Sequence, residues 1–258
     1  MTAGTNGARP GSRRDTGFRA RVGRELGLEP TTAEVVTAWL DAALPVSAGS
    51  ALDAGCGRLS HLKQFRSRLD RFSGVDIHEP ALPLGWLDEF RVADLCVDAD
   101  AFEPDSFDVA LSNFTVEHFA DPVAAFRMIL GWLRPSGTLV ITTVNRAHPF
   151  VDAYCSIPAE VRGRLQPFVK MSAADAHPVV GACNTPRLIR DGLIAAGYED
   201  IRIVTTDHLA RAWGRTLPTW GLGLIGDVAA HTMPARRSTI VAQARKPAAS
   251  TTMDAAGR

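Results

Sequence analysis

Short apolar runs alternate along this chain with longer segments in which apolar residues recur at helical spacing. The apolar runs have the length and the β-branched content typical of buried strands. They are found at residues 50–53, 71–77, 90–94, 107–112, 138–144, 201–205 and 237–244. Strands that alternate with helices need crossover connections, and such connections give a parallel sheet with both faces covered.

Helix signals separate these runs. Thr31 and Glu34 have the spacing of a capping box, and apolar residues at helical spacing follow as far as Leu44. Further helices are predicted at residues 59–69, 122–133 and 186–196. The pattern therefore predicts an α/β fold: a Rossmann-like, doubly wound, mostly parallel seven-stranded sheet with helices on both faces and a small cap insertion.

The alternation lapses at about residues 146–183, where neither period is clear. Long insertions of this kind in compact domains are usually lids or binding loops. We expect this segment to cap the site, and the alternative is that its apolar side chains pack locally. The expected lining residues are Phe150, Tyr154, Phe168 and Met171. The pattern assigns no structure to residues 208–234.

Both ends of the chain are rich in small and polar residues, and the first end also carries several arginines. Neither end can bury enough apolar surface to offset the entropy that is lost on ordering. We therefore expect disordered tails at residues 1–15 and 246–258, around a single domain at 16–245. A contact between the arginines and an anionic partner stays open, but a solvated tail is the simpler expectation.

Composition narrows the class of protein. Of the 258 residues, 46% are hydrophobic and 22% are charged, which is ordinary for a globular domain. The 28 basic and 28 acidic side chains balance, which argues against a nucleic-acid-binding protein. No apolar run approaches the ~20 residues of a membrane span, and no signal segment opens the chain. The four cysteines have neither zinc-site nor disulfide-framework spacing, so we expect a cytoplasmic protein.

A glycine turn follows the first predicted strand, where Asp53 is followed by Gly55, Cys56 and Gly57. Glycines let the main chain turn tightly and let a ligand approach it closely. In a parallel sheet, ligands bind at this carboxyl edge. A dinucleotide site is disfavoured, because Ser60 stands where the fingerprint has its third glycine and because Asp53 would repel a pyrophosphate. The glycine pair alone is a weak signal.

Two further carboxylates strengthen this signal. Asp76 ends the second predicted strand, close to the ~20-residue offset at which an acid accepts from both ribose hydroxyls. Asp94 ends the third, where a carboxylate can accept from an exocyclic amino group. Each acid taken singly could be a loop or cap residue. Acids suited to an amine, a vicinal diol and an adenine amino group together match the polar groups of S-adenosylmethionine.

The motifs LDAGCGR, GVDIHEP and VADL, and the stretch from residue 106 to residue 145, resemble the class I S-adenosylmethionine-dependent methyltransferases of small molecules. The resemblance is close over about residues 50–145 and looser from 184 to 244. One departure is Leu59, at which many members of the family have a third glycine. The resemblance implies a doubly wound sheet with S-adenosylmethionine as the cofactor.

The resemblance also implies roles for individual residues. The first acid and the glycine-turn main chain would hold the methionine part, and the second and third acids would take the ribose and the adenine amine. The apolar residue after each of these two acids would pack against the base, and the asparagine after the fourth strand would line the floor near the sulfonium. The implied cofactor-binding residues are Asp53, Gly55, Cys56, Gly57, Asp76, Ile77, Asp94, Leu95 and Asn113.

Residues 116–119 and 142–146 are similar to the O-methyltransferases of quinone biosynthesis. In that subgroup a metal is implied by a glutamate three residues before a Glu-His pair. Here that position is Phe114, which leaves only Glu117 and His118. Two side chains are too few ligands, so we predict no bound metal.

Methyl transfer to oxygen gains from a base that takes the proton, and histidine suits this role near neutral pH. His118 follows the fourth strand and is the first candidate, His148 the second and His177 the third. Each of them could instead be a capping or loop residue. The sequence thus predicts methyl transfer from S-adenosylmethionine to a small-molecule acceptor, with a hydroxyl oxygen as the expected nucleophile. The alternatives are N- or C-methylation and a catalytically inactive cofactor-binding protein. Neither the acceptor nor the oligomeric state follows from the sequence.

Overall fold

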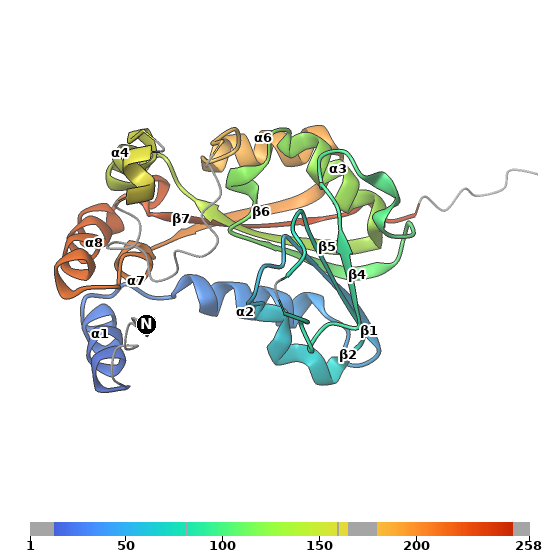
Figure 1. Cartoon of the computed structure of the whole chain (residues 1–258), viewed down its shortest axis with the longest axis horizontal. Helices are drawn as coiled ribbons and strands as arrows, with labels where there is room; N and C mark the ends of the chain where they lie inside the picture. The colour runs from blue at the N-terminus through green and yellow to red at the C-terminus, as the bar shows by residue number, and fades with distance from the viewer. Residues whose placement is uncertain (1–12, 81, 159, 165–179, 250–258) are drawn as a thin grey trace, which may run out of the picture.

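A computed structural model describes residues 13–80, 82–158, 160–164 and 180–249 (Figure 1). Seven strands form one sheet in the order β3-β2-β1-β4-β5-β7-β6. Neighbours from β3 to β5 pair in parallel, whereas β7 runs antiparallel to both β5 and β6. The strands are β1 (Gly49–Ala54), β2 (Leu69–Asp76), β3 (Glu89–Val92), β4 (Phe107–Asn113), β5 (Leu133–Val144), β6 (Glu199–Thr206) and β7 (Thr239–Arg245). The predicted α/β fold with a mostly parallel sheet is confirmed.

Helices cover both faces of the sheet, and the alternation of side chains along β4 shows how. Val109 and Leu111 pack in the apolar cluster that includes α2 (Thr32–Ala43) and the 3-10 helix η1 (His61–Arg68). Ala110, between them, packs in the cluster of the opposite face, with α3 (Pro122–Trp132) and α6 (Pro186–Ala196). Successive strand residues point to opposite faces, so a single buried strand serves both layers.

The helices begin where the local signals place them, with one difference. The side chain of Thr31 accepts from the main-chain N–H of Glu34, and the capping box is complete. Predicted helix 59–69 is instead the 3-10 helix η1, capped by Ser60. Its two buried side chains, Leu62 and Phe65, are three residues apart, which matches the three-residue turn of a 3-10 helix.

The cap at one end of the sheet is made of more than the predicted insertion. α4 (Pro149–Ser156) follows β5, while α7 (Leu209–Ala212) and α8 (Leu217–His231) come from the stretch for which the sequence predicted nothing. Figure 1 shows these helices grouped beyond the same end of the sheet. Phe150 and Tyr154 pack around Trp213 in this cap, with ring centroids 6.4 and 5.9 Å away. Phe168 and Met171, also expected there, lie outside the described residues.

The first helix, α1 (Arg13–Glu25), begins inside the stretch that we expected to be a tail. It lies beside α7 and α8 in Figure 1. The guanidinium of Arg19 donates to the carbonyl of Gly214 at 2.6 Å and lies over the ring of Trp220, and Phe18 lies 6.2 Å from that ring. Part of the arginine-rich segment is therefore attached to the cap. No helix in the described ranges has the length and hydropathy that crossing a membrane requires.

His148 joins two helices of the cap. Its Nδ1 accepts from the main-chain N–H groups of Phe150 and Val151 at 3.1 and 3.4 Å, so it is the N-cap of α4. Its Nε2 lies 3.2 Å from the carbonyl oxygen of Gly226 on α8. An imidazole that accepts at Nδ1 and donates at Nε2 is neutral. Burial lowers the pKa of His148, which favours the same neutral form.

We therefore predict that replacing His148 by Ala lowers the free energy of unfolding by about 1–2 kcal/mol, the usual cost of losing an N-cap. His148→Asn should recover most of this loss, because asparagine is among the best N-cap residues. Urea unfolding of the parent and the two variants measures the difference. Equal losses in both variants would show that the cap bond does not stabilise the protein.

Candidate functional site

The glycine turn after β1 has the main-chain geometry that the sequence suggested. Gly55 and Gly57 have φ angles of +80° and +48°, which residues with a side chain rarely adopt. A Cβ atom on Gly55 would lie 2.2 Å from Cγ2 of Thr115, so the turn after β4 packs directly on this glycine. A Cβ atom on Gly57 would have no described atom within 4 Å. Gly57 therefore presents bare main chain to open space.

Asp53 lies at the carboxyl end of β1, with its side chain buried. Within the described part of the chain, neither of its carboxylate oxygens has a hydrogen-bond partner. Burial raises the pKa of Asp53 to about 7; the nearby Asp76 carboxylate adds to this rise, while the Ser60 hydroxyl opposes it. A buried acid without a partner is costly to ionise, and a cation placed beside it would remove that cost.

Asp76 ends β2 and faces the glycine turn. Its Oδ2 accepts from the main-chain N–H of Gly57 at 3.1 Å, and its Oδ1 accepts from that of His78, also at 3.1 Å. Each carboxylate oxygen can still accept a second hydrogen bond. The next residue, Ile77, leaves 53% of its surface exposed. Asp76 and Ile77 thus place two acceptors beside an exposed apolar side chain.

Asp94 stands in the turn after β3, where its Oδ1 accepts from the main-chain N–H of Cys96 at 2.8 Å. Leu95 is buried in the core rather than exposed beside it. Cys56 is buried too, and its sulfur would lie 2.9 Å from a Cβ atom on Gly74. The side chains of Leu95 and Cys56 therefore pack inside the protein, and only their main chains face the turns.

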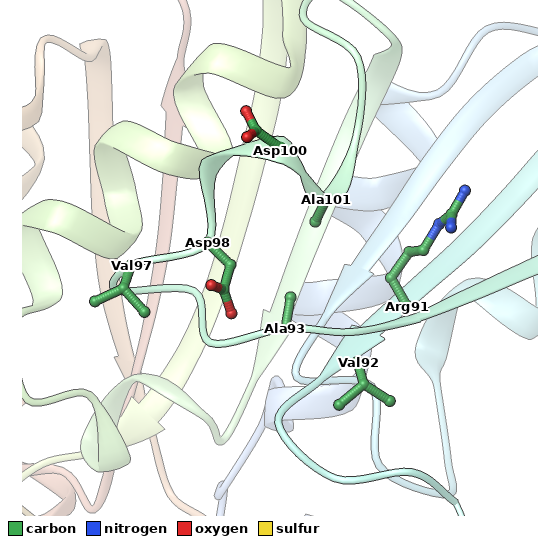
Figure 2. A pocket seen from close by; sticks show the side chains of 7 residues that line it. All are labelled: Arg91, Val92, Ala93, Val97, Asp98, Asp100 and Ala101. Carbon is green, nitrogen blue, oxygen red and sulfur yellow. The ribbon is translucent and has the colours of Figure 1, made fainter.

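A cavity of about 380 Å³ lies on the outer side of the Asp94 turn. Figure 2 shows its lining, in which Val97 and Asp98 stand on one side and Arg91 and Val92 on the other. The lining includes none of the glycine turn, Asp53 or Asp76. This cavity is therefore separate from the turns that carry those residues.

The turn after β4 packs against the glycine turn. Phe114 has a φ angle of +54°, and its main-chain N–H donates to the carbonyl of Thr142 at 3.0 Å. The hydroxyl of Thr115 donates to the carbonyl of Gly55 at 3.2 Å, which ties this turn to the glycine turn. Asn113 receives a hydrogen bond from Thr142 at 2.7 Å. Non-glycine residues at positive φ are uncommon and cluster at functional sites.

The side chains of Glu117 and His118, adjacent in the sequence, have different surroundings in the structure. Glu117 is buried, and its Oε2 accepts from the hydroxyl of Thr143 on β5 at 2.8 Å. His118 ends the 3-10 helix η3 (Val116–His118) and is half-buried. Among the described residues, no group of three or more side chains could hold a metal ion. Glu117 therefore faces the sheet, while His118 stays near the β4 turn.

The structure places the other two candidate histidines differently. Both ring nitrogens of His148 bind main-chain groups of the cap, so its geometry is that of a capping residue rather than of a base. His177 lies outside the described residues. The sequence analysis missed His208, whose ring centroid lies 5.3 Å from that of Phe114. Its place directly after the strand predicted at 201–205 was a signal that could have found it.

The unpartnered carboxylate of Asp53 should make stability depend on pH. The folded-state pKa of about 7 lies above the ordinary value of 3.8 for an aspartate, so the unfolded chain ionises first as pH rises. The parent thus loses stability between these two values, by on the order of 2–4 kcal/mol in full. We predict that Asp53→Asn raises the free energy of unfolding at pH 8 but changes it little at pH 4.

Urea unfolding at both pH values measures this difference, without cofactor. Asp70→Asn, which changes an exposed carboxylate on the adjoining strand, is the matched control and should show no such gain. A gain for Asp53→Asn that is equal at pH 4 and pH 8 would contradict a raised pKa of Asp53.

Comparison with known proteins agrees with this geometry. Residues 52–141 match the family model of a methyltransferase domain. A ubiquinone biosynthesis O-methyltransferase of Stutzerimonas stutzeri is 27% identical over 136 residues, which cover 50% of this chain and 58% of that protein. Phosphoethanolamine N-methyltransferase 1 of Arabidopsis thaliana is 29% identical over 137 residues, covering 50% of this chain and 26% of that protein. The chain thus matches little more than half of the first relative's length and less of the second.

A solved structure supports the same fold. An S-adenosylmethionine-dependent methyltransferase of Thermotoga maritima superposes with a TM-score of 0.52 at 15% identity, covering 90% of this chain and 96% of that one. The matched segment contains the glycine turn, Asp53, Asp76 and the β4 turn. The chain therefore has the fold of these methyltransferases, and its residues 52–141 are similar to a methyltransferase domain.

Proposed function

We propose that this protein binds S-adenosylmethionine in the crevice between the β1 and β4 turns and transfers its methyl group to a small-molecule acceptor, with a hydroxyl oxygen as the nucleophile. The observation that carries the proposal is Asp53, a buried carboxylate with no partner among the described residues. Within that part of the chain, the carboxylate of Asp53 has no neutralising partner, and the α-ammonium group of the cofactor is a cation that would supply one.

The remaining residues fit the other parts of the same molecule. Asp76 has acceptor capacity left for the ribose hydroxyls, and the exposed side chain of Ile77 beside it offers apolar surface for the base. Asp94 would accept from the adenine amino group, and Asn113 would lie at the floor near the sulfonium. The bare main chain of Gly57 allows the methionine part to approach closely.

S-adenosylmethionine supplies a methyl group that is activated by the positive charge on sulfur. The protein then has to align the acceptor with this carbon and exclude water. The cap helices α4, α7 and α8 lie together beyond one end of the sheet (Figure 1). His118, in the β4 turn, is our candidate for the base that takes the proton of an acceptor hydroxyl.

Methylation of nitrogen is the second candidate function. The relative from Arabidopsis thaliana carries the name of an N-methyltransferase, while the one from Stutzerimonas stutzeri carries that of an O-methyltransferase. An amine can react as its free base without proton removal in the transition state. Methylation of oxygen should therefore depend on His118 as a base more strongly than methylation of nitrogen does.

Calorimetry with S-adenosylmethionine tests cofactor binding. We predict that Asp53→Ala and Asp76→Ala each weaken binding by about tenfold or more, because each removes a hydrogen bond to a charged or diol group. Asp70→Ala, on the exposed side of β2, is the control and should bind as the parent does. Equal affinity in folded Asp53→Ala, Asp76→Ala and parent proteins would overturn the proposed cofactor site.

Methyl transfer over a panel of phenols, carboxylic acids and amines tests the activity. With a hydroxyl acceptor, we predict that His118→Gln lowers kcat by about 10²-fold or more and leaves cofactor affinity unchanged. A small effect of His118→Gln with an amine acceptor would favour N-methylation. Cofactor binding without transfer to any acceptor would favour the inactive alternative.

A further inference from the structure

One face of helix α8 packs closely against the rest of the cap. A Cβ atom on Gly223 would lie 2.8 Å from Cα of Ala210, and one on Gly226 would lie 2.9 Å from the ring of Phe150. The one acid of the helix, Asp227, is buried and accepts from the main-chain N–H of Ala210 at 2.8 Å. Its glycines therefore let this face of α8 come close to α7 and α4.

The opposite face of α8 is apolar as well, and it is exposed. Figure 1 shows α8 at the outer margin of the cap, beyond the end of the sheet. Surface helices ordinarily turn charged and polar side chains toward solvent. Here every residue of the exposed face is apolar. This outer face consists of Leu217, Pro218, Leu222, Ile225, Val228 and Ala229.

Helix α6, on the surface of the same chain, has the ordinary pattern. It exposes the apolar side chain of Ile194, but it also exposes Arg187, Arg190 and Asp191. The side chains of Arg187 and Asp191 form an ion pair at 3.5 Å. The outer face of α8 has no charged residue of this kind. An exposed apolar patch that is not interrupted by charges marks a surface for a protein or a membrane.

The exposed charges around the outer face are all positive. Arg211 lies in α7, Arg215 lies just before the N-cap of α8, and Arg236 lies in the segment that follows α8. All three are exposed, and among the described residues none of them forms an ion pair. The acids of the segment between β6 and β7, Asp207 and Asp227, have buried side chains. Arginines without a counter-charge therefore border both ends of the outer face.

Helix α1 extends this surface. Its exposed Phe18 lies beside Trp220 of α8, with the ring centroids 6.2 Å apart. The exposed charged residues of α1 that follow Phe18 are Arg21, Arg24 and Glu25, so their net charge is positive too. The apolar surface and its positive border thus continue from α8 to α1.

We propose that the outer face of α8 and the arginines at its ends form a docking surface for an anionic lipid bilayer. The apolar side chains would enter the boundary between headgroups and acyl chains, and the arginines would contact lipid phosphates. The 15 residues of α8 span about 22 Å, less than the ~30 Å of a bilayer core, so the helix would lie along the membrane surface. This inference goes beyond the proposed function and does not rest on it.

Charge favours a lipid surface over a second copy of the chain. In a two-fold dimer the same face of each copy would meet the other. Whether the two helices ran parallel or antiparallel, Arg215 and Arg236 of one copy would meet arginines of the other copy. Like charges repel, whereas anionic headgroups attract both arginines.

Flotation of the full chain with lipid vesicles tests the proposal. We expect the parent to bind vesicles of phosphatidylglycerol and phosphatidylcholine in equal amounts, and to bind phosphatidylcholine alone about tenfold more weakly or less. Ile225→Glu should weaken binding to the anionic vesicles by about tenfold or more, because it places a negative charge in the apolar face. The double variant Arg215→Gln and Arg236→Gln should weaken it by a similar factor, because two charges that attract the lipid are lost.

The matched control is Ile194→Glu, the same change on α6. The two isoleucines are alike in exposure, 58% for Ile194 and 62% for Ile225. Ile194→Glu should bind the vesicles as the parent does. Both substitutions change exposed side chains, and urea unfolding verifies that each variant is folded as stably as the parent.

Three outcomes would overturn the proposal. The first is a parent that does not bind the anionic vesicles, or that binds neutral and anionic vesicles alike. The second is equal binding by Ile225→Glu and Ile194→Glu. The third is a parent that is a dimer by sedimentation velocity and becomes a monomer in Ile225→Glu, because a second copy would then cover the outer face. None of these measurements depends on cofactor binding or methyl transfer, so they are distinct from a failure of the proposed function.

Discussion

The free-energy cost of ionising the buried carboxylate of Asp53 is the constraint on which the proposed site depends. β1 is central in the sheet and buried along its whole length, so its last residues cannot reach water. An aspartate at that place costs folding free energy as soon as it ionises. The fold tolerates this cost because the rest of β1 is bonded on both sides, to β2 and to β4. A cation placed beside the carboxylate would recover this cost, and this is why we propose Asp53 as a residue that binds the cofactor.

The turns after β1 and β4 are built against each other. Thr115 bonds the carbonyl of Gly55 and fills the space that a side chain there would need. The same turn holds Phe114 at positive φ, with two hydrogen bonds from its N–H to Thr142. The conformation of one turn thus requires glycine in the other.

The cap combines segments that are far apart in the chain. Trp213 stacks with Phe150, His148 bonds α8 through Gly226, and Arg19 of α1 bonds Gly214. The ring of His208, just before α7, lies 5.3 Å from that of Phe114, and buried Asp227 accepts from the first main-chain N–H of that helix.

Local signals in the sequence determined the strands and most helix starts, and they led to the proposed cofactor-binding residues. Apolar runs of the right length, the capping residues Thr31 and Thr185 and the glycine turn act through neighbours in the chain, so they can be read without coordinates. Because the carboxyl ends of parallel strands share one edge, Asp53 and Asp76 could be placed together before the fold was known.

Only the tertiary structure decided what the histidines contact. His148 and His208 both follow a strand, and no signal near either residue in the chain shows which distant groups its side chain meets. The packing of α4 on α8 makes His148 a buried cap, while the path of α7 across two strands brings His208 to Phe114. These contacts join residues that are distant in the chain, and the periodicity of the sequence carries no information about such contacts.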